Sequence, residues 1–434
     1  MDSIRGEVPS APIGTLGYFR WTKADGDNYQ VKRIVLITTK YPDQIGHEWL
    51  TNELADKMSE RDVSVSVVVL SWEFNDGETG CSRKNNVVIH RLRLWKFLYK
   101  KHVFCAFLKL ALFSIFGVLF FRHLIKSADL IVATTPCAAT WALLLKSLNR
   151  KARRYLIVWD FFPYYVEGFF KKLPNSAFQL MVYFEGCLYR QFNDAGCMTT
   201  SAMHFMATKY EVSGLKIGLL PLWTKQHPHS QVSASEKAHI RRNFSIPSES
   251  FVCVYGGAMT RVQDLDKLVD LALCAIDNPA FHFVFIGAGP DLIRLKSRVS
   301  NEGIKNVTFL PFLSRSDYGK LISACDLGLI SLSSRHSVPS FPSKTIDYLR
   351  FGLPILATID NSTDYGDILV KDIKAGLYVD TSSAIDLYAA LSFLRSSPDA
   401  LAEYSSNGRR YYDENLNVDY AACTVLQECD AHVP

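Results

Sequence analysis

Two parts of the chain repeat one order of elements: a short apolar run, a glycine-containing loop, a helical pattern and another apolar run. In the first half these are residues 34–38, a loop with Pro42 and Gly46, a predicted helix over 48–61 and the run 63–70. Apolar runs without polar alternation are typical of parallel strands covered by helices on both faces. The pattern therefore predicts a βαβ unit.

The same alternation begins again in the second half of the chain. Strands are predicted at residues 251–255, 281–286, 307–310, 327–330 and 354–357, with helical patterns between them. The fold class that follows is α/β, with two Rossmann-like doubly wound domains that face each other across a cleft. The predicted parts are an N-terminal extension (1–30), an N-terminal domain (31–223), a C-terminal domain (224–410) and a C-terminal helix returning to the first domain (411–434).

One segment, residues 95–126, does not fit a plain Rossmann domain. Val103 to Phe121 are 19 residues interrupted only by Lys109, which approaches the length of a membrane span. A span would put neighbouring strands of one sheet on opposite sides of the bilayer. We therefore predict an interfacial helix lying in the plane of an anionic cytoplasmic membrane surface. The alternative is a core helix of the first domain, which rarely has basic residues at both ends.

The charge of the chain is concentrated in this region. Residues 79–128 contain ten Lys or Arg and no Asp or Glu, so the rest of the chain carries −5 against an overall +5. Such a small overall charge gives no indication of a nucleic-acid partner. The ten cysteines are scattered without a C-x-x-C spacing, and the first thirty residues lack an apolar signal core. These features predict a cytoplasmic protein that is peripherally bound to the inner face of the cell membrane.

Three short motifs have simple structural explanations. Gly287-Ala-Gly289 follows a predicted strand, but the third glycine of a dinucleotide fingerprint is replaced by Leu292. Asp264-Leu-Asp266 resembles a metal-binding D-x-D pair, yet it opens a helix, where aspartate is a favoured cap. His47-Glu48 lacks the second histidine of H-E-x-x-H. We therefore predict no metal site.

The most informative stretch begins at Pro342. Pro342-Ser343 opens a predicted helix whose first turn carries Lys344, and an ammonium at a helix N-terminus favours a phosphate. Asp347 lies three residues on, therefore on the same helix face, where its carboxylate can accept hydrogen bonds from sugar hydroxyls. The alternative is a capped surface helix with an ion pair between these two residues.

At these residues the chain resembles a known family. The pattern Pro342-Ser-Lys-x-x-Asp-Tyr-Leu-x-x-Gly-x-Pro354 is similar to the signature of GT-B glycosyltransferases of family 4, also called group 1. The likeness is greatest to a bacterial polysaccharide branch with N-acetylfucosamine transferases and colanic-acid enzymes. It covers roughly residues 31–415, with further matching segments at 256–263, 285–290, 306–311, 324–328, 129–136, 159–163, 201–203 and 220–223.

The resemblance implies a sugar nucleotide held mainly by the C-terminal domain and an acceptor held by the N-terminal domain. It assigns the diphosphate to the loop at Gly257 and to Arg261 and Lys344, and the ribose to Asp347. The backbone at Pro311 and Phe312 would frame the base. The sequence departs from the family pattern at Pro339, where many members have a first glutamate, and at Gln263, where a lysine is usual.

Two residues of the first domain complete the predicted site. Asp160 follows the strand 155–159, at the strand end where α/β sheets place ligands, and would orient or deprotonate the acceptor hydroxyl. A helix cap or a loop carboxylate bonded to backbone amides is an equally good interpretation. Gly46, at the first βα turn, would let the backbone approach the donor sugar.

The function predicted from these features is a retaining, metal-independent glycosyltransferase, with retention implied by the family. It would move a sugar from a UDP- or GDP-sugar to a lipid-linked acceptor, a polyprenyl diphosphate saccharide. Two alternatives stay open: a GT-B sugar-nucleotide epimerase or hydrolase, and a catalytically degenerate, membrane-associated assembly subunit. An oxidoreductase is least supported because the glycine fingerprint is incomplete. The sequence leaves the sugar, the linkage and the oligomeric state open.

Overall fold

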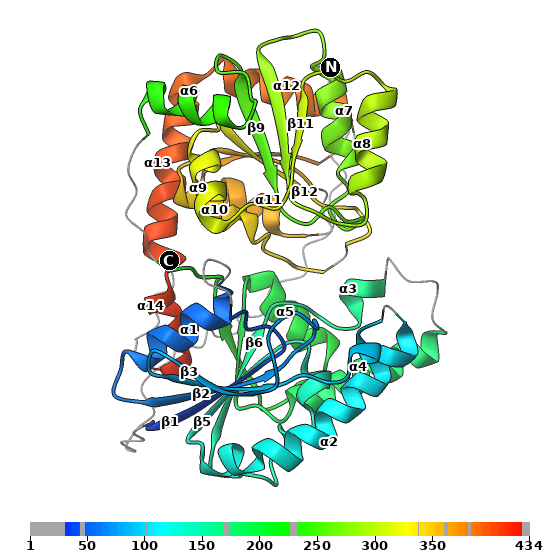
Figure 1. The fold of residues 1–434 in the computed structure, drawn as a ribbon, viewed down its shortest axis with the longest axis vertical. Coiled ribbons are helices and arrows are strands. Elements are labelled where there is room, and N and C mark those ends of the chain that lie inside the picture. The colour runs from blue at the N-terminus through cyan, green and yellow to red at the C-terminus, as the bar shows by residue number, and fades with distance from the viewer. Residues whose placement is uncertain are drawn as a thin grey trace, which may run out of the picture.

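The protein folds into two α/β domains, one above the other in Figure 1. The computed structural model describes residues 31–43, 48–100, 102–167, 174–225, 232–336, 338–359, 363–380 and 383–427. The predicted N-terminal extension and Gly46 lie outside these residues. Two sheets covered by helices confirm the predicted fold class of two Rossmann-like domains.

The first domain is built on an eight-stranded sheet with the order β3-β4-β2-β1-β5-β6-β7-β8. The strands are β1 (Arg33–Thr38), β2 (Ser64–Leu70), β3 (Gly80–Lys84), β4 (Val87–Leu92), β5 (Leu130–Thr134), β6 (Arg153–Val158), β7 (Asp194–Cys197) and β8 (Lys216–Leu219). All neighbours are parallel except the β3–β4 hairpin, which the sequence analysis did not anticipate. The order of strands reverses between β1 and β5, so their carboxyl ends form the natural ligand-binding edge.

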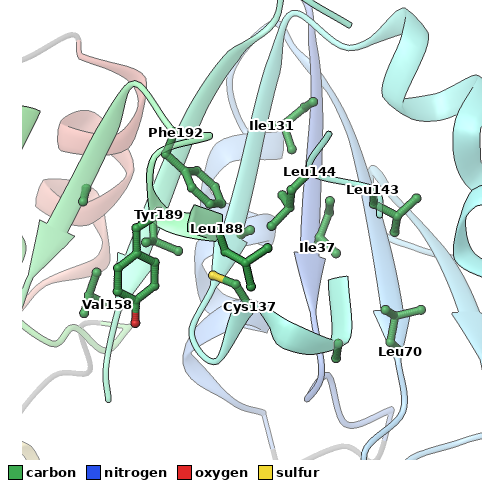
Figure 2. Packing of buried hydrophobic residues seen from close by; sticks show 14 of the residues in the cluster. Ile37, Leu70, Ile131, Cys137, Leu143, Leu144, Val158, Leu188, Tyr189 and Phe192 are labelled. Carbon is green, nitrogen blue, oxygen red and sulfur yellow. The ribbon is translucent and has the colours of Figure 1, made fainter. Parts of the chain in front are cut away.

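Helices cover both faces of this sheet. They are α1 (Leu50–Ser59), η1 (Lys96–Tyr99), α2 (Val103–Ser127), η2 (Cys137–Thr140), α3 (Tyr164–Glu167), α4 (Asn175–Tyr189) and α5 (Thr200–Lys209). On one face α2, η2, α4 and α5 share a single apolar cluster with the strands. Figure 2 shows part of this cluster, in which Leu143, Leu144 and Leu188 lie around Ile37 and Ile131 of the central strands. On the other face α1 packs against alternate residues of the same strands.

Helix α2 occupies most of the segment that was predicted to be interfacial. One side of it is buried through Phe113 and Ile125, which belong to the cluster shared with the sheet, and through Gly117, which faces Leu143. Lys109 is also on this inner side, because its Nζ donates a hydrogen bond to the carbonyl oxygen of Trp72 over 3.0 Å and lies 3.8 Å from the Trp72 ring centroid. Lys109 is therefore not one of the basic residues that could face an anionic membrane surface. Burial of the long stem and capture of the ammonium by a carbonyl stabilise the inward position.

The second domain contains a six-stranded parallel sheet with the order β11-β10-β9-β12-β13-β14. Its strands are β9 (Phe251–Gly256), β10 (Phe281–Ile286), β11 (Val307–Leu310), β12 (Leu327–Ser331), β13 (Ile355–Thr358) and β14 (Gly376–Val379). Its helices are α6 (Ala234–Asn243), α7 (Asp266–Cys274), α8 (Leu292–Asn301), α9 (Arg315–Ser323), α10 (Lys344–Arg350), α11 (Tyr365–Asp367), η3 (Ile368–Ile373), α12 (Ala384–Arg395) and α13 (Pro398–Asn415). The strand order reverses between β9 and β12, the switch point at which open sheets bind ligands.

The chain crosses between the domains twice, and the two crossings are hydrogen-bonded to each other. The amide of Thr224 donates to the Leu416 carbonyl over 3.0 Å, and the amide of Val418 donates to the Thr224 carbonyl over 3.2 Å. After the second crossing, α14 (Val418–Leu426) packs on α1 of the first domain, as Figure 1 shows. The predicted boundary between residues 410 and 411 falls inside α13, because Tyr412 is still buried in the second-domain cluster.

The cysteines follow the expectation of reduced thiols at eight positions. Cys81, Cys105, Cys137, Cys187, Cys197, Cys253, Cys274 and Cys325 are free. Cys423 is disulfide-bonded and departs from that expectation.

Candidate active site

The site in the second domain is formed where the loop after β9 meets the start of α10. Gly257 has φ +146°, a conformation that residues with a Cβ rarely adopt, and a Cβ there would lie 3.3 Å from Cε of Lys344. The hydroxyl of Tyr348, one residue after Asp347, accepts from the Gly256 amide over 3.1 Å and donates to the Val254 carbonyl. The tyrosine of the motif therefore fixes α10 to the end of β9.

Lys344 is the central cation of this arrangement. Its Nζ donates to Oε1 of Gln263 over 2.8 Å and lies 5.0 Å from the ring centroid of Tyr255. It forms no ion pair with any carboxylate in the described part of the chain. Desolvation at this half-buried position lowers the pKa of Lys344 to about 8. A desolvated ammonium without a counter-ion favours an anionic ligand. Because α10 has only seven residues, the lysine contributes more to the attraction of an anion than the helix dipole does.

Gln263, which replaces the usual lysine of the family, has a structural partner in Lys344. Its amide oxygen receives the hydrogen bond from the lysine and also lies 3.4 Å from the Tyr255 hydroxyl. Glutamine at this position therefore removes one positive charge from the loop, but its amide oxygen orients the ammonium of Lys344. Arg261, in the same loop, is exposed and forms no ion pair among the described residues.

The glycine pair after β10 serves loop packing. A Cβ at Gly287 would lie 2.2 Å from the Gly257 carbonyl oxygen, and one at Gly289 would lie 2.2 Å from the Met259 carbonyl oxygen. Both glycines therefore allow the loops after β9 and β10 to touch. This contact explains the motif without a dinucleotide.

Asp347 lies on α10 as the sequence spacing predicted. Burial raises the pKa of its carboxyl, and the nearby Arg315 guanidinium opposes that rise. Its carboxylate has no hydrogen-bond partner within the ranges that the structure describes, so the ion pair with Lys344 that the alternative interpretation required is not formed. Phe312, in the loop after β11, follows Pro311 and has 67% of its surface exposed.

Both aspartates of the D-x-D pair have basic partners, and Asp264 lies 3.8 Å from Nζ of Lys267. Oδ2 of Asp266 lies 2.7 Å from Arg294, and its Oδ1 lies 2.9 Å from Arg298. These hydrogen bonds lower the pKa of Asp266. Asp266 thus lies in the first turn of α7 and belongs to a surface ion network with α8, but the cap residue of α7 is Leu265, so the predicted aspartate cap is not formed.

On the first-domain side, Asp160 follows β6. The amides of Trp159 and Asp160 both donate to the hydroxyl oxygen of Thr135, over 3.0 and 3.2 Å. No backbone amide in the described part of the chain donates to the carboxylate of Asp160, so the cap interpretation is not supported. The side chain is solvent accessible, yet desolvation by the surrounding protein raises its pKa. A raised pKa suits a group that accepts a proton.

Sequence reasoning missed the residues that join the domains at this site. Arg315, at the start of α9, pairs with Glu53 of α1 and also contacts Thr224 at the first crossing. Cavities of about 600 and 530 Å³ flank Arg315, and neither is lined by Lys344 or Asp347. We therefore define the candidate site by Lys344, by the loops after β9 and β10, and by the carboxyl ends of β6 and β9. Glu53 and Arg315 are too far apart in the sequence for any local pattern to connect them.

Two facing Rossmann-like domains, each with a ligand-binding edge, define the GT-B class of glycosyltransferases. The sequence model of the family Glycosyl transferases group 1 matches residues 236–411. The matched residues lie in the second domain, which is therefore similar to group 1 glycosyltransferases, and these comparisons identify the chain as a glycosyltransferase.

Known relatives share this fold at low identity. A protein of Escherichia coli (strain K12), the putative colanic acid biosynthesis glycosyl transferase WcaI, is 22% identical over 293 residues, 66% of this chain and 69% of the relative. A sucrose-phosphate synthase from Thermosynechococcus elongatus has a TM-score of 0.70 at 13% identity, covering 92% of this chain and 98% of the other. Anabaena Alr3699/HepE, solved with UDP and glucose, has a TM-score of 0.62 at 14% identity, covering 92% and 99%. The structural matches establish the fold.

Proposed function

We propose that this chain transfers a hexosyl or N-acetylhexosaminyl group from a UDP- or GDP-sugar to a lipid-linked saccharide at the cytoplasmic face of the cell membrane. The polysaccharide setting, an O-antigen, capsule or exopolysaccharide, is proposed from the likeness to WcaI and the bacterial polysaccharide branch. The observation that carries the donor assignment is the unpaired ammonium of Lys344 facing the Gly257 loop at the switch point of the second sheet.

The chemistry follows from where the charges lie. The bond between the anomeric carbon and the diphosphate oxygen breaks while the acceptor oxygen forms a new bond to that carbon, with retention. Negative charge grows on the departing diphosphate, where Lys344 and Arg261 stabilise it. Asp347 accepts hydrogen bonds from the ribose, and the exposed ring of Phe312 offers a surface for the base.

Asp160 serves the acceptor. It stands at the carboxyl end of β6 with a carboxylate that no backbone amide in the described residues occupies, and it accepts the hydrogen of the attacking hydroxyl. None of these steps needs a metal. In the D-x-D pair, Asp266 is engaged by Arg294 and Arg298, and Asp264 pairs with Lys267 over 3.8 Å.

The experiment that tests this function is calorimetric titration with UDP and GDP, followed by a transfer assay in EDTA. We expect micromolar binding of one nucleotide and sugar transfer to a polyprenyl diphosphate saccharide that persists in EDTA. Free sugar or an epimer formed from donor alone would instead establish a hydrolase or epimerase. Binding of neither nucleotide would establish a non-catalytic assembly subunit.

A further inference from the structure

The first domain carries an unusual concentration of exposed apolar side chains on one side. Twelve of the nineteen large apolar side chains that are exposed in the described residues lie in three neighbouring segments. We call these twelve the apolar face: Trp95, Phe97, Phe104, Phe107, Ile115, Leu119, Phe120, Trp141, Leu145, Leu180, Tyr183 and Phe184. Contiguous exposed apolar surface of this kind marks an interaction site.

The elements that carry the apolar face lie on the same side of the first sheet. Helices α2 and α4 cover the same face of the first sheet and contribute to one core cluster. The segment between them, around η2, packs directly on α2, since a Cβ at Gly117 would lie 3.2 Å from Leu143. Trp141 and Leu145 flank this buried contact and are exposed, so the outer sides of both helices and of the connecting segment form one surface.

The exposed charges on the segments that carry this surface are basic. Lys96, Lys100, Arg122, Lys126 and Lys146 are exposed, and none forms an ion pair with a described carboxylate. No acidic residue occurs from 79 to 128, and the only one in α4, Glu185, is buried with its carboxylate turned to the Cys137 amide. An apolar surface with basic residues along its segments is complementary to the acyl chains and anionic headgroups of a membrane.

We propose that α2, the segment at Trp141–Leu145 and α4 together form a two-helix surface that docks the enzyme on an anionic lipid bilayer. The helix α2 is long and apolar enough to cross a membrane by length and composition. It cannot cross while the sheet is intact, because it connects β4 to β5 of one sheet and buries Phe113 and Ile125 against that sheet. It therefore contacts the bilayer along its length.

A second copy of the chain fits this surface less well than a membrane. A symmetric dimer would bring the same basic residues of two copies together, and like charges at that distance repel. Nothing acidic in the three segments is exposed to offset this repulsion.

The position of α4 gives this surface a role in the reaction, which rests on the proposed lipid-linked acceptor. Phe178 of α4 packs edge-on against Tyr164, with ring centroids 5.2 Å apart. Tyr164 follows Asp160 by four residues. A lipid docked along α4 is thus held next to the loop that carries Asp160.

The test is cosedimentation with vesicles of phosphatidylglycerol and phosphatidylethanolamine, without donor or acceptor. Two variants probe the helices separately: Phe107→Ser with Leu119→Ser on α2, and Leu180→Ser with Phe184→Ser on α4. A third, Arg122→Glu with Lys126→Glu, probes the basic residues. The matched control is Ile385→Ser with Phe393→Ser, because these side chains are equally exposed on α12 of the second domain.

We expect each of the three variants to weaken vesicle binding about tenfold or more and the control to bind like wild type. Circular dichroism and thermal unfolding should show all four proteins folded. The α4 variant should lose transfer to the lipid-linked acceptor but keep transfer to a water-soluble acceptor analogue, which separates a failure of docking from a failure of the proposed enzyme.

Four results would overturn the proposal. The first is that the wild-type protein does not bind vesicles at low salt, and the second is that the α4 variant binds like wild type. The third is that the protein stays on the vesicles after an alkaline carbonate wash. The fourth is that the wild-type protein sediments as a dimer and the α2 variant as a monomer. The second would restrict the surface to α2, the third would show a span and the fourth would show a protein interface.

Discussion

Oε1 of Glu53 lies 2.7 Å from the guanidinium of Arg315, and the two residues belong to different domains. Glu53 is almost fully buried, and its other carboxylate oxygen accepts from the Lys225 amide over 2.8 Å, next to the first crossing. Arg315 is also the cation that acts most on the Asp347 carboxylate. One ion pair thus connects the first domain, the crossing and the proposed ribose-binding residue.

Breaking this pair should loosen the two domains. Glu53→Gln or Arg315→Gln leaves a largely buried charge without its partner, and we expect a loss of about 2 kcal/mol in the free energy of unfolding. Spin labels on α1 and α9 should report a broader distribution of interdomain distances. Arg294→Gln, which breaks an exposed pair within one domain, is the control and should change neither quantity. An unchanged distance distribution in both interdomain variants would contradict this role.

The diphosphate assignment predicts a kinetic effect. Lys344→Ala or Arg261→Ala should lower kcat/KM at least about tenfold, the loss of one charge-assisted contact of about 1.5 kcal/mol. Both proteins should unfold at nearly the wild-type temperature. Lys296→Ala, an exposed lysine on α8, should keep full activity. Wild-type rates in both Lys344 and Arg261 variants would place the diphosphate elsewhere.

Donor binding should depend on pH through Lys344. Burial lowers its pKa from the ordinary 10.5 to about 8, so the ammonium is present below pH 8 and is lost above it. The affinity for UDP should therefore fall as the pH rises from 7 to 9.5. The free energy of unfolding should rise between pH 8 and 10.5. In that range the folded protein has already lost the proton of its desolvated Lys344 ammonium, whereas the unfolded chain still holds it. Lys344→Arg keeps its charge and should bind UDP equally at pH 7 and 9.5; a fall as steep as that of the wild type would exclude Lys344.

Asp160 should act on the chemical step alone. Asp160→Asn keeps the size of the side chain but accepts a proton poorly, so we expect kcat to fall about a hundredfold while the Kd of UDP stays constant. Calorimetry and initial rates measured on the same preparation separate these two quantities. Asp399→Asn, on an exposed position of α13, is the control. Full activity of the Asp160 variant would show that this carboxylate takes no part in the chemical step.

Much of the fold and of the candidate donor site was predictable because it rests on local patterns. The apolar runs at β1, β2, β9 and β10 were placed within about a residue, since a strand buried on both faces must be continuously apolar. Lys344 and Asp347 share a helix face because helical spacing requires it. The β3–β4 hairpin was missed because β3 is largely exposed and carries no apolar pattern.

What the sequence by itself determined is the order of elements, the class of fold and the motif that carries the candidate donor site. Only the tertiary structure decided which side of α2 is buried, because a helix that is apolar all round has no periodicity to choose a face. It also turned Lys109 inward and joined α4 to the apolar face. It brought Glu53 to Arg315 for the same reason: contacts between distant segments depend on how whole layers pack, and no local pattern records that packing.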